Sequence, residues 1–364
     1  MIDVKKNIMR RVERLAEKVR KTEADAFVII TDEDANWESL YYMSGFRGTA
    51  GALAVFADGS AELRVDSRYI EQAKKQSPLE VTELSGEPHK GIAESIKKHS
   101  CKKVMCEAQK TYHSTWDALA AIVCMTDGTQ IIKDLRRCKD AEETALIKKA
   151  ADIGSRAFTE TLAEARPDMT EMQFKALLEY KTTLLGAGLG FDMIVASGLR
   201  SVMPHGRASE KKFAYGEWVT VDYGASYCGY FCDITRNITI GRPTEEALKL
   251  HALVAKAHSE AAAMLRAGVS GKEVHAKAVS VFAAEGKDKY FTHSLGHGLG
   301  LEVHEAPLLS HRKDFTLHVG DIVTVEPGLY IPNFGGMRCE DDYLITENGA
   351  VRLTESLPQK LYSL

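Results

Sequence analysis

The chain has 364 residues, of which 45% are hydrophobic and 27% are charged, and its formal net charge is -4. This length predicts two domains of about 100–200 residues each, and the composition is that of a globular protein with a buried core. The charge provides no positive field for nucleic acid or an anionic membrane, and no apolar run is long enough to span a bilayer, so we expect neither partner.

The first third of the chain alternates strand-like and helix-like segments. Apolar residues at helical spacing predict a helix over about residues 4–19, and the run AFVII at 26–30 predicts a buried strand. The dipeptide Asp58-Gly59 between two apolar segments predicts a β-hairpin. Helical and strand-like segments then alternate to about residue 130, so the pattern predicts an α/β domain, which we place at residues 1–135.

The second domain, placed at residues 136–364, has a different pattern. An amphipathic segment at 140–165 with acids in its first turn predicts a long helix, and further helices are predicted over 171–185, 244–266 and 271–284. Two β-rich segments, EWVTVDYGA at 217–225 and YFCDITRNITI at 230–240, are predicted to pair antiparallel. This mixture predicts an α+β domain.

Four carboxylates lie in the β-rich segments of this second domain. Asp222 and Asp233 could face one another across the antiparallel pair, where aspartate is depleted and like charges repel, so a cation between them would resolve the conflict. Glu326 ends a third β-rich run, and Glu340 lies inside a fourth, with Arg338 two residues earlier on the same strand face. A structural role is the alternative for each residue alone.

The segment HSLGHGLGLEVHEAP at 293–307 places His293, His297 and His304 among closely spaced glycines. A phosphate-binding loop is disfavoured because the lysine of the GxxxxGK[ST] motif is missing. We expect the glycines to form a loop whose backbone can pass close to a crowded site. Carboxylates with one imidazole suit two divalent ions such as Mn, Co, Fe or Zn, which together can activate a water molecule. A carboxylate-bridged dinuclear site is therefore one interpretation.

The residues of this domain resemble those of the pita-bread metallopeptidases, and most closely the Xaa-Pro branch of aminopeptidase P and prolidase. The resemblance is carried, in order, by MPHG (203–206), DYG (222–224), DITR (233–236), HSLGHGLGLEVHE (293–305), VEPGLY (325–330) and RCEDD (338–342). Each motif alone is weak, but the ordered set is specific. Residues 44–55 and 66–73 resemble the creatinase-like N-terminal domain of that branch. The resemblance thus implies a creatinase-like α/β domain followed by an α+β pita-bread catalytic domain.

The resemblance also implies a role for each matching position. Two divalent ions would be held by Asp222, Asp233, His297, Glu326 and Glu340, with Asp233 and Glu340 bridging. Glu326 would in addition take the proton from the attacking water that bridges the ions. His205 and His304 would bind the substrate and stabilise the tetrahedral intermediate, His293 would line the same pocket, and Arg338 would orient Glu340 and its neighbours.

The implied activity is removal of the N-terminal residue that precedes proline in short peptides. Manganese is the expected metal, with cobalt, zinc or iron as alternatives, and we expect a homodimer. The first alternative is a prolidase restricted to dipeptides. More distant ones are a methionine-type aminopeptidase, a metal-free creatinase-like amidinohydrolase and a non-catalytic binding protein.

The cysteines and the histidines outside the motifs are expected to have no catalytic role. Seven cysteines without a CxxC pair and an N-terminus without an apolar signal segment favour a cytoplasmic location with reduced thiols. Cys339 is expected to be a buried strand residue. The histidines outside the motifs are His89, His99, His113, His251, His258, His275, His311 and His318.

Overall fold

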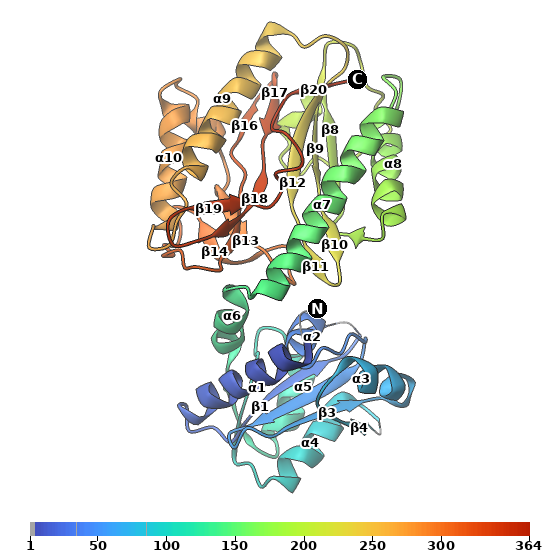
Figure 1. Cartoon of the computed structure of the whole chain (residues 1–364), viewed down its shortest axis with the longest axis vertical. Helices are drawn as coiled ribbons and strands as arrows, with labels where there is room; N and C mark the ends of the chain where they lie inside the picture. Colours follow the sequence, from blue (N-terminus) through green and yellow to red (C-terminus); the bar gives the residue numbers. More distant parts are fainter. Residues whose placement is uncertain (1–3, 34, 85) are drawn as a thin grey trace. The chain divides into compact units, whose positions relative to one another are not determined.

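The computed structural model describes residues 4–33, 35–84 and 86–364, and the chain separates after Arg136 into two compact units. The N-terminal unit contains a six-stranded mixed sheet of order β4-β3-β2-β1-β5-β6 (Figure 1). Its strands are β1 (Ala26–Thr31), β2 (Gly51–Phe56), β3 (Ala61–Val65), β4 (Glu80–Glu83), β5 (Lys103–Cys106) and β6 (Cys124–Asp127). Its helices are α1 (Val4–Arg20), α2 (Trp37–Ser44), α3 (Ile70–Gln76), α4 (Pro88–Lys98), α5 (His113–Ala120) and α6 (Thr129–Arg137), with a 3₁₀ turn at Ser67–Tyr69.

The hairpin predicted at Asp58-Gly59 joins β2 to β3. Gly59 has a φ of 98°, a left-handed conformation that favours glycine, and Asp58 Oδ1 accepts hydrogen bonds from the backbone and hydroxyl of Ser60. The antiparallel register places Leu53 opposite Leu63, and both side chains are fully buried. The first third of the chain therefore has the α/β structure that its pattern predicts.

The second unit contains two pairs of helices and four sheets. The helices are α7 (Ala141–Glu164), α8 (Glu171–Leu184), α9 (Glu245–Ala262) and α10 (Gly271–Ala283), with 3₁₀ turns at Gly198–Val202 and Asp288–Tyr290. The sheets have the orders β11-β10-β7, β20-β12-β9-β8, β14-β13-β15-β18-β19 and β16-β17. Helices α7 and α8 lie over the strands β8 to β12, and α9 and α10 lie over the later strands (Figure 1).

The strands of this unit come in two groups along the chain. The first group is β7 (Gly188–Leu189), β8 (Ile194–Ser197), β9 (Trp218–Tyr223), β10 (Ala225–Tyr227), β11 (Tyr230–Phe231) and β12 (Ile234–Thr239). The second is β13 (Gly296–Gly298), β14 (Glu305–Leu309), β15 (Ile322–Val325), β16 (Gly328–Ile331), β17 (Gly335–Arg338), β18 (Asp341–Ile345), β19 (Ala350–Arg352) and β20 (Tyr362–Ser363). The predicted α+β mixture is confirmed.

Capping residues set the helix starts. Asp140 accepts hydrogen bonds from the backbone of Glu142 and Glu143, and Glu143 accepts one in return, so α7 begins with a capping box close to the predicted position. Helix α9 ends at Ala262, four residues before the predicted end. Beyond it the backbone N–H of Leu265 donates to the carbonyl oxygen of Ala262, three residues earlier, which is the hydrogen bond of a 3₁₀ turn and not of an α-helix. Among the described residues, no helix has the length and apolar content that crossing a membrane requires.

Candidate metal centre

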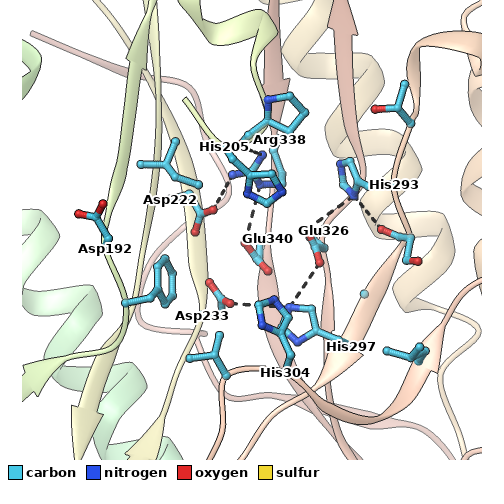
Figure 2. Close-up of a pocket in the computed structure, with 18 of the residues that line it drawn as sticks. Asp192, His205, Asp222, Asp233, His293, His297, His304, Glu326, Arg338 and Glu340 are labelled. Atoms are coloured by element: carbon cyan, nitrogen blue, oxygen red, sulfur yellow. Dashed lines mark hydrogen bonds and ion pairs between the residues drawn. The ribbon is translucent and has the colours of Figure 1, made fainter. Parts of the chain in front are cut away.

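All the predicted site residues of the second unit line one cavity of about 630 Å³ (Figure 2). The five predicted ligands are Asp222, Asp233, His297, Glu326 and Glu340, and the other predicted site residues in the cavity are His205, His293, His304 and Arg338. The two aspartates come from the first group of strands, whereas the histidine and both glutamates come from the second. The cavity therefore lies where the two halves of the unit meet.

Asp222 lies on β9 and Asp233 immediately precedes β12, and the pairing of these strands is offset from the expected register. Asp222 on β9 pairs with Thr235 on β12, so Asp233 is two residues away from the facing position and the expected direct opposition is wrong. Because side chains alternate along a strand, Asp233 and Thr235 still point the same way. The β10–β11 hairpin continues this register without a shift as far as its turn at Cys228 and Gly229, which both have positive φ angles, so the position of that turn sets the pairing.

The glycines around His297 form a buried strand rather than the expected loop. Strand β13 pairs with β14 on one side and β15 on the other. A Cβ atom on Gly296 would lie 2.0 Å from the carbonyl oxygen of Thr324, and one on Gly298 would lie 2.4 Å from that of Ala306. The glycines therefore allow neighbouring strands to approach the backbone on either side of His297, which fixes the position of that residue.

His297 presents one ring nitrogen to the acidic side chains. Its Nε2 lies 3.8 Å from Asp233 Oδ2 and 3.5 Å from Glu326 Oε1. On the opposite side of the ring, Nδ1 lies 3.1 Å from the carbonyl oxygen of Gly298 and donates its proton there. Burial, and after it His304, lowers the pKa of His297 to about 3. A neutral ring with a free Nε2 lone pair is the form that binds a metal ion.

Glu326 and Glu340 occupy the points at which strands end. Glu326 directly follows β15, as predicted. Glu340 is not inside a continuous strand, because β17 pairs with β16 whereas β18 pairs with β15, and the chain changes sheets between Arg338 and Asp341. At this change of sheets Glu340 forms an isolated bridge with Thr235, whose hydroxyl donates to Glu340 Oε2 at 2.6 Å.

The acidic side chains lack sufficient positive charge around them. Burial raises the pKa of Asp233 and Glu326 well above the usual range, and the neighbouring carboxylates raise it further. Burial and Asp222 together raise the pKa of Glu340 to about 8. Oδ1 of Asp222 and Oδ1 of Asp233 are buried without a hydrogen-bond partner within the part of the chain that the structure describes.

Divalent cations fit this arrangement. Ligand atoms of Asp233, His297 and Glu340 all lie within 4.8 Å of one another. Clustered buried carboxylates are stable when a cation compensates them, and oxygen ligands with one imidazole are a donor set that hard or borderline divalent ions accept.

Arg338 is the main cation next to this group. Its Nη2 donates to Asp222 Oδ2 at 2.6 Å and its Nε donates to the Thr235 hydroxyl at 3.0 Å, whereas Nε lies 4.0 Å from Glu340 Oε2. Arg338 therefore contacts Asp222 directly and reaches Glu340 through Thr235. Its Nη1 also donates to the hydroxyl of Tyr330 at 2.5 Å.

The three other imidazoles differ in how firmly they are held. His293 donates from Nδ1 to the Ser294 carbonyl at 2.8 Å, and its Nε2 lies 3.0 Å from the Tyr330 hydroxyl, which donates to it. Burial and Arg338 lower the pKa of His293 to about 3. His205 and His304 are exposed, and the ring centroid of His304 lies 4.3 Å from that of His297. These two imidazoles are accessible to a bound peptide.

Three residues that take part in the site were not singled out from the sequence. Thr235 links Arg338 to Glu340, Tyr330 links Arg338 to His293, and Asp342 accepts a hydrogen bond from the backbone of Asp233 at 3.0 Å. Thr235 and Asp342 each follow a predicted ligand by two residues. The two-residue period of a strand was therefore a signal that could have identified both.

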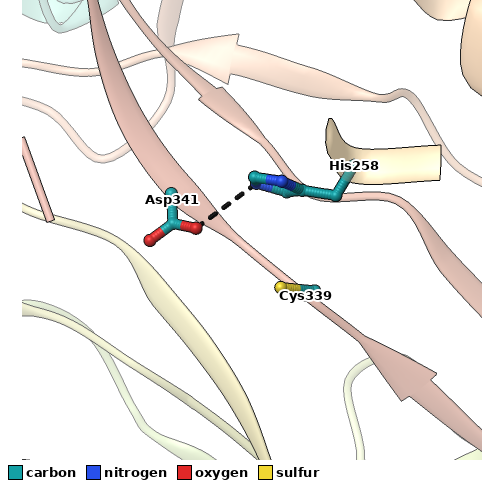
Figure 3. A group of neighbouring side chains, drawn as sticks. All are labelled: His258, Cys339 and Asp341. Atoms are coloured by element: carbon teal, nitrogen blue, oxygen red, sulfur yellow. Dashed lines mark ion pairs between the residues drawn. The ribbon is translucent and has the colours of Figure 1, made fainter. Parts of the chain in front are cut away.

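A second polar group, His258, Cys339 and Asp341, lies nearby (Figure 3). Asp341 Oδ1 accepts from Arg236 Nη2 at 2.6 Å and from the Thr354 hydroxyl at 2.5 Å, and burial raises the pKa of Cys339 to about 12. The carboxylate already has a cationic partner and the sulfur is a thiol, so this group is a hydrogen-bonded network rather than a second metal site. Cys339 is buried as expected but lies between two strands.

Comparison with known proteins agrees with this site. Residues 145–347 match the metallopeptidase family M24, and residues 11–138 match the Creatinase/Prolidase N-terminal domain. The chain belongs to the metallopeptidase family M24. This M24 metallopeptidase is 40% identical over 328 residues to the uncharacterized peptidase YqhT of Bacillus subtilis strain 168. The aligned region covers 89% of this chain and 92% of the relative.

Two solved structures resemble this M24 metallopeptidase over nearly its whole length. The X-Pro aminopeptidase of Thermotoga maritima MSB8 has a TM-score of 0.91 at 36% identity and covers 95% of this chain and 100% of its own. The Xaa-Pro dipeptidase of Bacillus anthracis has a TM-score of 0.93 at 37% identity and covers 98% of this chain and 100% of its own. The predicted family, the pita-bread fold and the assignment as a metallopeptidase are thereby confirmed.

Proposed function

We propose that this M24 metallopeptidase uses two divalent metal ions to hydrolyse the bond between an N-terminal residue and proline in short peptides. The observation that carries the proposal is the group of carboxylates around His297, which is buried and insufficiently compensated by positive charge. Manganese is the proposed metal, with cobalt, zinc or iron as alternatives. The names of the two similar solved structures support the Xaa-Pro bond as the site of cleavage.

The proposed ligands are the five side chains that the sequence predicts. The ions would be held by Asp222, Asp233, His297, Glu326 and Glu340, with Asp233 and Glu340 shared between them. When bound, two such ions supply an activated water and a Lewis acid for the scissile carbonyl group. The Oδ1 atoms of Asp222 and Asp233, which have no hydrogen-bond partner among the described residues, are the ligand atoms that most clearly need a cation.

Glu326 is the proposed proton acceptor. Its Oε1 faces His297 Nε2 at 3.5 Å and its Oε2 lies 3.8 Å from His293 Nδ1, so the carboxylate lies between two neutral imidazoles. Burial and the neighbouring carboxylates raise the pKa of Glu326, so the side chain needs the positive charge of the metal ions to be ionised and to act as a base. It can therefore take the proton of the attacking water and pass it to the leaving prolyl nitrogen.

His205 and His304 are the proposed donors to the developing oxyanion. Both side chains are exposed and line the cavity, where a peptide can reach them. The His304 ring is only partly open to solvent, since one side of it lies next to His297, and this partial desolvation lowers its pKa, so the ring is neutral near pH 7 and carries one N–H donor. A positioned donor of this kind stabilises the tetrahedral intermediate more than the planar substrate.

The cavity suits a short proline-containing peptide. Its volume of about 630 Å³ lies within the range of ligand sites, about 300–1,000 Å³, and is too small for a folded chain. Phe191, Ile194 and Leu308 provide apolar wall that the pyrrolidine ring can contact. Proline has no N–H to donate, so an apolar wall recognises it better than a hydrogen-bond acceptor would.

Hydrolysis of three peptides tests the proposal. We expect release of alanine from Ala-Pro-Ala with added Mn²⁺ or Co²⁺, and slow or undetectable cleavage of Met-Ala-Ala. Cleavage of Ala-Pro alone would assign a dipeptidase instead of an aminopeptidase. Cleavage of Met-Ala-Ala in preference to both prolyl peptides would contradict the Xaa-Pro proposal. The expected homodimer and cytoplasmic location stay predictions from the sequence.

A further inference from the structure

We propose that Glu171, at the start of α8 and outside the cavity lining, is a positioning residue that fixes His205 in the active site. The inference rests on the proposed function, because it assumes that His205 contacts the substrate. Glu171 is fully buried, although nothing in the proposed chemistry uses it directly. A buried carboxylate away from the reacting groups needs hydrogen-bond partners that account for it.

The partners of Glu171 lie on both sides of His205 in the sequence. Oε1 accepts from the backbone and the hydroxyl of Ser197, each at 2.7 Å. Oε2 accepts from the backbone of Ser209 at 3.0 Å and from its hydroxyl at 2.7 Å. Ser197 ends strand β8, and Ser209 follows the MPHG segment, so one carboxylate joins the two ends of the segment that carries His205.

Arg200 extends this connection into the segment itself. Its Nε donates to Glu171 Oε2 at 3.1 Å, and its Nη2 donates to the carbonyl oxygen of Arg207 at 2.7 Å. The backbone of Gly206 donates to the Met203 carbonyl at 3.0 Å, which closes a turn around His205. Because the His205 side chain is exposed, the course of this backbone determines where the imidazole lies.

The start of helix α8 does not explain the contacts of Glu171. Thr170 caps the helix and forms a capping box with Gln173. The backbone N–H groups of Glu171 and Met172 donate to the carbonyl oxygens of Lys211 and Ser209, so the first N–H groups have acceptors without the Glu171 side chain. A carboxylate in the first turn also interacts favourably with the helix dipole, but an exposed side chain would do so equally. The hydrogen bonds of Glu171 to Ser197, Arg200 and Ser209 therefore act on the His205 segment.

A double-mutant cycle tests this role. Glu171→Gln keeps the shape of the side chain but replaces one acceptor oxygen with an NH₂ group, which cannot accept the N–H donors of the segment. We expect kcat on Ala-Pro-Ala to fall by about tenfold to a hundredfold, with a smaller change in KM, because the donor is displaced from the oxyanion. In a His205→Ala background, the same substitution should change kcat by less than about twofold.

Two further variants keep the test decisive. Ser209→Ala removes only one hydroxyl group that donates to Glu171. It should lower kcat in the wild-type background, by less than Glu171→Gln does, and have little effect in the His205→Ala background. This variant keeps the inference testable if Glu171→Gln does not fold. Glu143→Gln is the matched control, since Glu143 is also a buried carboxylate in the first turn of a helix, α7. Its effect on kcat should be the same in the wild-type and His205→Ala backgrounds.

The outcomes separate this inference from the proposed function. An equal loss of kcat from Glu171→Gln in both backgrounds would show that Glu171 supports the fold generally, and would overturn the inference alone. Full activity of His205→Ala would overturn the proposed role of His205 and the inference with it. Unchanged metal content in Glu171→Gln, with strong coupling to His205, is the expected result.

Discussion

Arg338 and Asp222 form a hydrogen bond of 2.6 Å through only one oxygen of the carboxylate. The second oxygen, Oδ1, is buried and has no hydrogen-bond partner among the residues described. The guanidinium therefore fixes the orientation of Asp222, which lines the cavity, and leaves one oxygen of its carboxylate available to a metal ion. This arrangement is typical of a ligand that is held in place by a neighbouring donor before the metal ion binds.

The substitution Arg338→Lys should weaken metal binding. Lysine keeps the positive charge but cannot reach Asp222, Thr235 and Tyr330 at the same time, so the ligand loses its fixed orientation. We expect the metal affinity to fall by about tenfold to a hundredfold, as measured by calorimetric titration of metal-free protein with Mn²⁺. Arg207→Lys, at the exposed rim of the same cavity, should bind Mn²⁺ as the wild type does. Equal affinities for all three proteins would disprove the role of Arg338.

His304→Ala should separate catalysis from metal binding. The exposed imidazole is a proposed donor to the intermediate, and removal of one such donor lowers kcat by about a hundredfold to a thousandfold. Bound metal, measured by elemental analysis, should stay at the wild-type level. His318→Ala, an exposed histidine outside the cavity lining, is the control and should keep full activity. Loss of metal from His304→Ala would show that His304 is a ligand.

The glycines around His297 give a prediction about stability. A Cβ atom on Gly296 would lie 2.0 Å from the backbone oxygen of Thr324, so strand β13 or β15 would have to move. We expect Gly296→Ala to lower the free energy of unfolding by about 1–3 kcal/mol or more, and to reduce metal content because His297 is the next residue.

Gly349→Ala is the matched control for this substitution. No described atom lies within 4 Å of the position of its added Cβ atom, so its free energy of unfolding should stay within about 0.5 kcal/mol of the wild type. Denaturant unfolding of the two variants measures the difference. Equal stability of Gly296→Ala and the wild type would contradict the close packing of β13.

The sequence identifies the residue types of the site better than their geometry. Asp222, Asp233 and Glu326 are conspicuous because acids are unusual in β-rich runs, and the helix starts follow from local capping residues. The register of β9 and β12 is set by the two-residue turn at Cys228 and Gly229, which pairs Asp222 with Thr235 and leaves Asp233 two residues from the facing position. The alternation of side chains in the strands alone does not show at which residues the turn lies.

Contacts between residues far apart in the chain were also inaccessible to sequence reasoning. The β-rich run at 335–346 appears continuous, but its two halves pair with different partners, and only that pairing places Glu340 at the change of sheets. In the sequence Glu171 is an ordinary first-turn acid of a helix, because Ser197 and Ser209 approach it only in the folded unit. Local patterns do not specify which segments meet.

His258 should make the stability of the second unit depend on pH. Burial lowers the pKa of His258 to about 4, although Asp341 opposes this effect. Below about pH 6.5 the unfolded chain binds a proton that the folded chain binds only near pH 4, so the free energy of unfolding falls as the pH decreases through this window. Between pH 7 and pH 5 the loss from this residue should be about 2 kcal/mol.

Denaturant unfolding of His258→Gln at both pH values measures this contribution. The variant should lose about 2 kcal/mol less than the wild type between pH 7 and pH 5, whereas His318→Gln should lose as much as the wild type. An equal loss for His258→Gln and the wild type would show that His258 is not held neutral by burial.

The dependence of peptidase activity on bound metal tests the central claim most directly. Protein stripped of metal by a chelator is titrated with Mn²⁺ while bound metal and hydrolysis of Ala-Pro-Ala and Ala-Pro are measured together. We expect no hydrolysis without metal, full activity at two ions per chain, and loss of both binding and activity in Asp233→Asn. Full activity of a metal-free protein, with no stoichiometric binding of Mn²⁺, Co²⁺, Zn²⁺ or Fe²⁺, would contradict the account.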